Sequence, residues 1–208
     1  MFGENCDFER GRMALENLRK ELFKICEAID LCMSKKLINS SLILLYSGMD
    51  ILGWLQYGDS LRSGQRFCNW VESYMLPLPN SSCNSTDLYG ARCGLVHTFT
   101  PDSDLSKKGK ARKILYAWGT SEIHDLNEMI DLANMNEYVP VKIEILITAF
   151  RNGVESFLSD LEKIPEKAQA VYARSASFFT TMSEEEKKDL LNWAKLQLKQ
   201  PPPTAAGQ

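Results

Sequence analysis

Arg92 and His97 lie five positions apart in a segment that reads RCGLVH, and their side chains are the best suited to chemistry in this sequence. Histidine moves protons near neutral pH, and arginine stabilises negative charge on phosphate oxygens. Such a pair can cleave a phosphodiester without a metal ion. Pro101 disfavours helical geometry at the preceding residue, so we expect a helix that ends soon after His97. The dipole at that end favours a charged imidazole.

The spacing of the pair does not place both side chains on one face of the helix. Residues five apart differ by about 140° around the axis. The long side chain of Arg92 can bridge part of this gap, or the pair can meet groups from a second copy of the chain. Attack by a 2′-hydroxyl needs a proton acceptor and a proton donor, and this segment offers one histidine. We therefore expect a two-fold dimer with the Arg92 helices facing each other.

A structural alternative stays open for the same residues. Arg92 could be an ion-paired arginine, and His97 a helix-terminal histidine with an ordinary hydrogen bond. Asp50, a lone carboxylate among apolar neighbours, needs a partner if it is buried, and it either holds Arg92 or makes another hydrogen bond. Tyr89 lies within about 80° of His97 around the helix, so it either stacks on a base or packs. His124 stands in a polar context, and we expect it to face solvent.

A run of basic residues follows the Arg92 segment. It either forms a solvated loop or contacts an RNA backbone beside the phosphate site. Its members are Lys107, Lys108, Lys110, Arg112 and Lys113.

The composition is that of an ordinary globular protein and excludes a globally basic nucleic-acid binder. Of 208 residues, 44% are hydrophobic and 25% charged, and the net charge is −3. We see no apolar run of the roughly 18 residues expected of a membrane span, no glycine-rich phosphate loop and no metal-ligand cluster. We therefore expect no membrane association, cofactor or metal. The six cysteines form no Cys-x-x-Cys pair, which favours reduced thiols in the cytoplasm.

Apolar residues recur at three- and four-residue spacing along most of the chain, which predicts helices. The segment 111–118 is short enough to be a strand or a helical turn. Pro140 suits a first helical position, and Ser183 can cap a last helix by pairing with Glu186. Ser85, Thr86 or Asp87 can cap the Arg92 helix. The other predicted helices cover residues 12–33, 36–56, 62–75, 122–134 and 140–161.

Over roughly residues 12–162 the chain resembles the HEPN superfamily. The resemblance rests on Arg92, four intervening residues and His97 near the end of a late helix, on the order of the helices and on Asp50 in the apolar second helix. It implies an all-α HEPN-like bundle with a short strand or hairpin insertion and a C-terminal helical extension. In active members the arginine and histidine form a metal-independent endoribonuclease site assembled across a dimer. Cys93 stands where the family often has a polar residue.

We accordingly expect a HEPN-like domain over 1–164, a helical extension over 165–200 and a disordered tail over 201–208. The favoured function is a cytoplasmic endoribonuclease that acts in microbial defence or as a toxin. Its expected partners are RNA, a second copy and an inhibitory or antitoxin protein. One alternative is a non-catalytic HEPN-like module that binds a protein or nucleotide, and another is a helical regulator without a nucleic-acid role.

Overall fold

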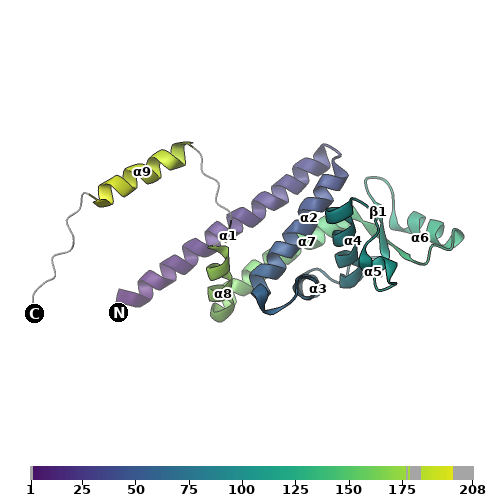
Figure 1. Ribbon diagram of the computed structural model, residues 1–208, viewed down its shortest axis with the longest axis horizontal. Helices are drawn as coiled ribbons and strands as arrows, with labels where there is room; N and C mark the ends of the chain where they lie inside the picture. Colours follow the sequence, from purple (N-terminus) through teal and green to yellow (C-terminus); the bar gives the residue numbers. More distant parts are fainter. Residues whose placement is uncertain (1, 177, 179–183, 199–208) are drawn as a thin grey trace, which may run out of the picture. The chain divides into compact units, whose positions relative to one another are not determined.

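The computed structural model describes residues 2–176, 178 and 184–198. The expected cap of the last helix at Ser183 and the expected disordered tail lie outside the described residues. Most described residues are helical, as the sequence predicts (Figure 1). In chain order the elements are α1 (Phe2–Ser34), α2 (Ile38–Tyr57), the 3₁₀ turn η1 (Gly58–Ser60), α3 (Ser63–Tyr74), α4 (Ser85–Thr98), α5 (Asp104–Lys107), β1 (Lys113–Ala117), α6 (Ile123–Leu132), β2 (Tyr138–Lys142), α7 (Ile143–Lys163), α8 (Pro165–Ser175) and α9 (Glu184–Leu198).

Helix α2 is the centre of the bundle because its sequence is apolar nearly all round. It contacts α1, α3, α4, α7 and α8, and its residues Leu45, Met49, Leu52 and Leu55 are completely buried. Figure 1 shows α1 and α2 as neighbouring helices joined by a short corner. This helix carries Asp50 into the bundle.

One described stretch, Ile38–Ser60, is long and apolar enough by length and composition to cross a membrane. We expected no membrane span, because the sequence has no unbroken apolar run of that length. Half of the residues in its apolar 18-residue window are buried inside the fold, where the stretch forms the core helix α2. A core helix meets the same criterion because it is apolar on every side.

The chain divides into two units, 1–176 and 177–208. Helix α8 packs on α1, α2 and α7 and therefore belongs to the first unit. The boundary thus falls after Ala176, whereas we expected one at residue 164. In the second unit, α9 exposes Leu190 and Leu191.

The expected insertion is a β-α-β unit in which β1 and β2 pair in parallel, with α6 as the connection. It is not a hairpin, because parallel strands need such a crossover. The prediction that Pro140 opens a helix is wrong. Pro140 pairs with Leu115 in the sheet, and α7 begins at Ile143. Both strands of a two-stranded sheet are edge strands, where proline is tolerated.

Helix α4, which carries Arg92 and His97, is capped by Asn84 rather than by the three residues we expected. The side-chain oxygen of Asn84 accepts a hydrogen bond from the Asp87 amide at 2.9 Å, and the Asp87 carboxylate accepts one from the Asn84 amide at 3.2 Å. The helix ends at Thr98, so the stop before Pro101 is confirmed. Asp87 is thus part of the cap without being the N-cap.

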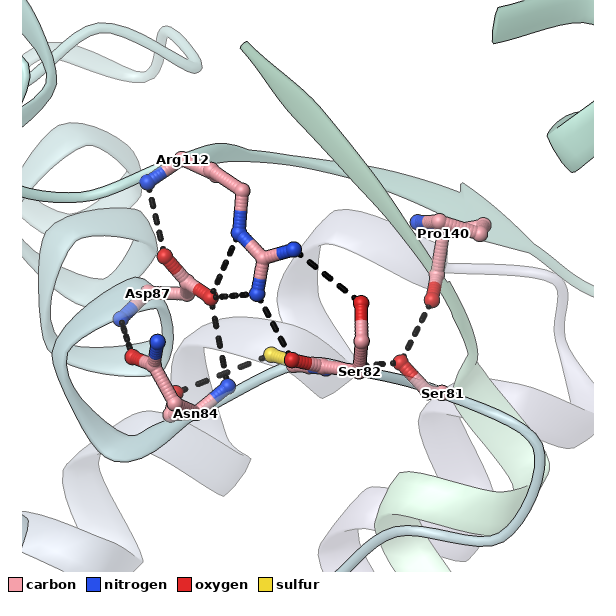
Figure 2. A network of polar contacts seen from close by, with 7 residues as sticks. Ser81, Ser82, Asn84, Asp87, Arg112 and Pro140 are labelled. Atoms are coloured by element: carbon pink, nitrogen blue, oxygen red, sulfur yellow. Dashed lines mark hydrogen bonds and ion pairs between the residues drawn. The ribbon is translucent and has the colours of Figure 1, made fainter. Parts of the chain in front are cut away.

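A buried ion pair fixes α4 against the β-α-β unit (Figure 2). Asp87 is only 1% exposed, and its carboxylate accepts hydrogen bonds from the amide, Nε and Nη2 of Arg112 at 2.7, 3.2 and 2.7 Å. The same guanidinium donates to the hydroxyl and carbonyl of Ser82. Ser81 donates to the carbonyl of Pro140 at 2.8 Å. The start of α4, the preceding loop and both strands therefore form one connected network.

We expect Arg112→Ala to lower the free energy of unfolding by about 3 kcal/mol, because it leaves a buried carboxylate without its cation. Lys113→Ala is the matched control: Lys113 pairs with Asp102, whose side chain is 45% exposed. Its loss should cost no more than about 1 kcal/mol. Urea unfolding of both variants measures the difference. Equal, small losses would contradict the structural role of Arg112.

Candidate active site

The structure brings Arg92 and His97 together within one protomer. Nη1 of Arg92 lies 3.0 Å from Nε2 of His97. The two residues start from different faces of α4, and the arginine side chain crosses the gap, as the sequence suggested it could. The pair therefore needs no second chain to make contact.

The contact determines which ring nitrogen of His97 faces the guanidinium. A guanidinium has only N–H donors, so Nε2 of His97 must accept the hydrogen bond and carry no proton. The ring proton then resides on Nδ1. We expected the helix dipole to favour a charged imidazole, and His97 does lie in the last turn. In this contact Nε2 is an acceptor, which is the role that a general base needs.

Asp50 anchors the arginine from the core. Its Oδ2 accepts a hydrogen bond from Nε of Arg92 at 2.6 Å, and the two side chains are 23% and 21% exposed. This confirms the first of the two roles that we considered for Asp50. Burial raises the pKa of the Asp50 carboxyl, and the charge of Arg92 counteracts that rise. Burial opposes the charged form of Arg92, but the attraction of Asp50 prevails and the pKa of Arg92 is raised.

Tyr89 is half-buried and packed in place. Its ring lies 5.4 Å from that of Phe67, and its hydroxyl lies 3.3 Å from that of Ser63. A Cβ at Gly64 would come within 2.8 Å of the Tyr89 ring, so a glycine leaves room for it. Tyr89 packs on one side and borders a pocket on the other.

That pocket has a volume of about 390 Å³ and lies between α4 and the segment around α5. His97 lines it together with Tyr89 and Cys93, which precede it at four-residue spacing on α4. Asp104 and Lys107 line it from α5. Cys93 also interacts with Arg92 and Tyr89. The imidazole therefore stands between the pocket and the guanidinium.

The basic run does not act as one surface. Arg112 is committed to Asp87 and Ser82, so we withdraw it from the RNA-binding candidates. Lys113 is partnered by Asp102 at 2.8 Å. The remaining members are exposed, and only one of them lines the pocket: they are Lys107, Lys108 and Lys110.

Other candidate groups are accounted for. His124 is 80% exposed beside Asp125, as expected. Within the described part of the chain, no group of three or more histidine, cysteine or acidic side chains could hold a metal ion. Cys83 is buried, which raises the pKa of its thiol to about 12.

Sequence reasoning missed the apolar end of α4. Phe99 is 60% exposed and closes the helix in a left-handed conformation, with φ of 57°, which is unfavourable for a bulky side chain. Val96, one residue before His97, is also exposed. The position of Phe99 between a helix end and Pro101 is the signal that could have marked it.

Comparison with known proteins adds no assignment: no family model, no curated protein and no solved structure matches the chain. The interpretation of the site therefore rests on its own geometry.

We expect Arg92→Met to raise the pKa of Asp50 further, because it removes the main influence that lowers it. At neutral pH the variant should unfold about 1–3 kcal/mol more easily. An acid with a raised pKa in the folded state binds its proton more tightly there, so this loss should shrink as the pH falls through that pKa. NMR titration of Asp50 and urea unfolding across pH test this. Arg92→Lys keeps the cation and should shift the pKa less; an unchanged pKa in both variants would contradict the pairing.

Proposed function

We propose that the protein is a metal-independent endoribonuclease of the HEPN type. The observation that carries the proposal is the contact between Arg92 and His97, with Arg92 held from the core by Asp50. In this contact a guanidinium that can bind phosphate lies beside an imidazole at an exposed helix end. The resemblance of the sequence to the HEPN superfamily supports the same conclusion. We place the reaction in the cytoplasm, in keeping with the half-exposed free thiols of Cys32, Cys68 and Cys93.

The reaction is attack of a ribose 2′-hydroxyl on the adjacent phosphate. A phosphate oxygen that takes Nη1 of Arg92 competes with Nε2 of His97 and frees that nitrogen. Nε2 then accepts the proton of the 2′-hydroxyl, whose oxygen forms a bond to phosphorus. The bond from phosphorus to the 5′-oxygen of the next nucleoside breaks, and Arg92 stabilises the charge on the phosphate. The products are a 2′,3′-cyclic phosphate and a 5′-hydroxyl.

The leaving 5′-oxygen needs a proton, which a second copy supplies from its own His97 in the protonated form. The end of α4 is suited to meeting such a copy, since Val96 and Phe99 are exposed apolar side chains beside His97. A bulky residue kept at positive φ is a strained feature of the kind found at functional sites. Burial of both side chains against their symmetry mates would align two histidines across the dimer axis.

A non-catalytic binding module is the second candidate. Cys93, beside Arg92, and the engagement of the arginine with two internal partners favour it. In that case the same pocket, with Lys107 in its lining, binds a nucleotide or a protein, including an inhibitory partner, without turnover.

Purified protein is expected to cleave single-stranded RNA in the presence of EDTA, and His97→Ala should lower the rate by at least about 100-fold because it removes the proton acceptor. His124→Ala is the matched control, since it is the only other histidine and is exposed. Gel analysis of products and detection of cyclic phosphate ends provide the measurement. Cleavage that is equally fast in the His97→Ala protein would exclude this mechanism.

Phe99→Gly is expected to separate folding from assembly. Glycine adopts positive φ without penalty, so the protomer should gain about 1 kcal/mol of stability. The dimer should dissociate at least tenfold more readily, because an exposed apolar contact is lost. Leu132→Ser is the control, since Leu132 is 78% exposed at the end of α6. Analytical ultracentrifugation measures both; equal dissociation constants for the two variants would contradict the α4 interface.

A further inference from the structure

The pocket beside His97 has a fixed shape because two glycines allow the chain to close tightly on α4. A Cβ on Gly94 would lie 2.8 Å from the backbone oxygen of Asp102, and one on Gly90 would lie 2.9 Å from the Cβ of Ala111. The segment that follows α4 therefore packs directly on the helix backbone. Neither contact leaves room for a larger side chain, so the segment that contributes Asp102 to the pocket is held against α4.

The charged groups of the pocket divide into one that is already neutralised and two that are available. Asp102 pairs with Lys113 at 2.8 Å. Asp104 and Lys107 are exposed, lie three residues apart on α5, and make no side-chain hydrogen bond or ion pair with another residue in the described part of the chain. The pocket therefore offers one carboxylate acceptor, one ammonium donor and the ring of Tyr89.

This set of groups matches a particular base. Guanine presents two adjacent N–H donors, N1–H and the N2 amino group, which suit the two oxygens of a carboxylate, and accepts hydrogen bonds at O6 and N7, which suit an ammonium group. Adenine lacks the N1 proton, and uracil offers a single N–H. Bases that leave the stack in single-stranded RNA commonly lie on aromatic side chains.

We propose that the pocket binds the guanine of the nucleotide whose 2′-hydroxyl attacks, so that cleavage occurs on the 3′ side of guanosine. The carboxylate of Asp104 accepts from N1–H and N2–H, and Lys107 donates to O6. The base lies against Tyr89, which places its ribose beside His97 and its 3′-phosphate at Arg92. The proposal rests on the endoribonuclease function for the site of cleavage, but binding of the nucleotide itself does not require turnover.

The first test measures binding of the four nucleoside 3′-monophosphates to the full chain by calorimetry. The guanosine compound should bind at least tenfold more tightly than the other three. Asp104→Asn and Lys107→Gln should each remove at least tenfold of that affinity. Lys108→Gln is the matched control, because Lys108 is an exposed neighbour that does not line the pocket. Equal affinity for the four compounds, or an equal loss in the Lys107 and Lys108 variants, would overturn the proposal.

The second test maps cleavage of an RNA that contains each nucleotide in several single-stranded contexts. Cuts confined to the 3′ side of guanosine, and spread over all nucleotides in Asp104→Asn, support the pocket assignment. Cuts distributed evenly by the wild-type protein overturn it while leaving the endoribonuclease intact. If no RNA is cleaved, the endoribonuclease proposal fails, and selective guanosine 3′-monophosphate binding that is lost in Asp104→Asn still supports guanine recognition by the pocket.

Discussion

The buried carboxylate of Asp87 is the constraint on which the placement of the candidate site depends. A charge that is almost inaccessible to water is tolerated only with full hydrogen bonding, and Arg112 and the amide of Asn84 provide it. Arg112 directly precedes β1 and Asn84 precedes α4, so the first turn of the helix is tied to the start of the strand and to the preceding loop. The helix then carries Arg92 at its middle and His97 in its last turn. The polar network thus fixes the position of residues that it does not touch.

A second carboxylate, that of Asp50, is largely buried and holds the side chain of Arg92 from the core. Asp50 lies on the helix that is otherwise the most apolar of the bundle, and its burial raises the pKa of its carboxyl. An apolar residue there would stabilise the bundle more simply. What the carboxylate adds is a fixed orientation for Arg92, whose Nε donates to Asp50 while its Nη1 contacts His97. Asp50 therefore holds the guanidinium of Arg92 in a fixed orientation before any ligand binds.

Local patterns predicted the helices well, because apolar periodicity is a property of neighbouring residues. The meeting of Arg92 with His97 and the partnership with Asp50 could also be anticipated, since side-chain length and the need of a buried charge for a partner limit the options. Contacts between segments that are distant in sequence could not be anticipated in this way. Arg112 looked like one of five solvent-facing cations, and only the folded chain brings it to a buried carboxylate. Pro140 suits a helix start and an edge strand equally, and the pairing of a strand distant in sequence decides between them.

The contact between Arg92 and His97 also determines what a bound phosphate would change at this site. A guanidinium has only N–H donors, so Nη1 of Arg92 uses Nε2 of His97 as its acceptor. A phosphate oxygen at Arg92 would compete for Nη1, because charge-assisted hydrogen bonds to phosphate are strong. Nε2 of His97 would then be free to accept another hydrogen bond. In the proposed reaction, phosphate binding and proton acceptance are therefore coupled through one guanidinium, which Asp50 holds in place.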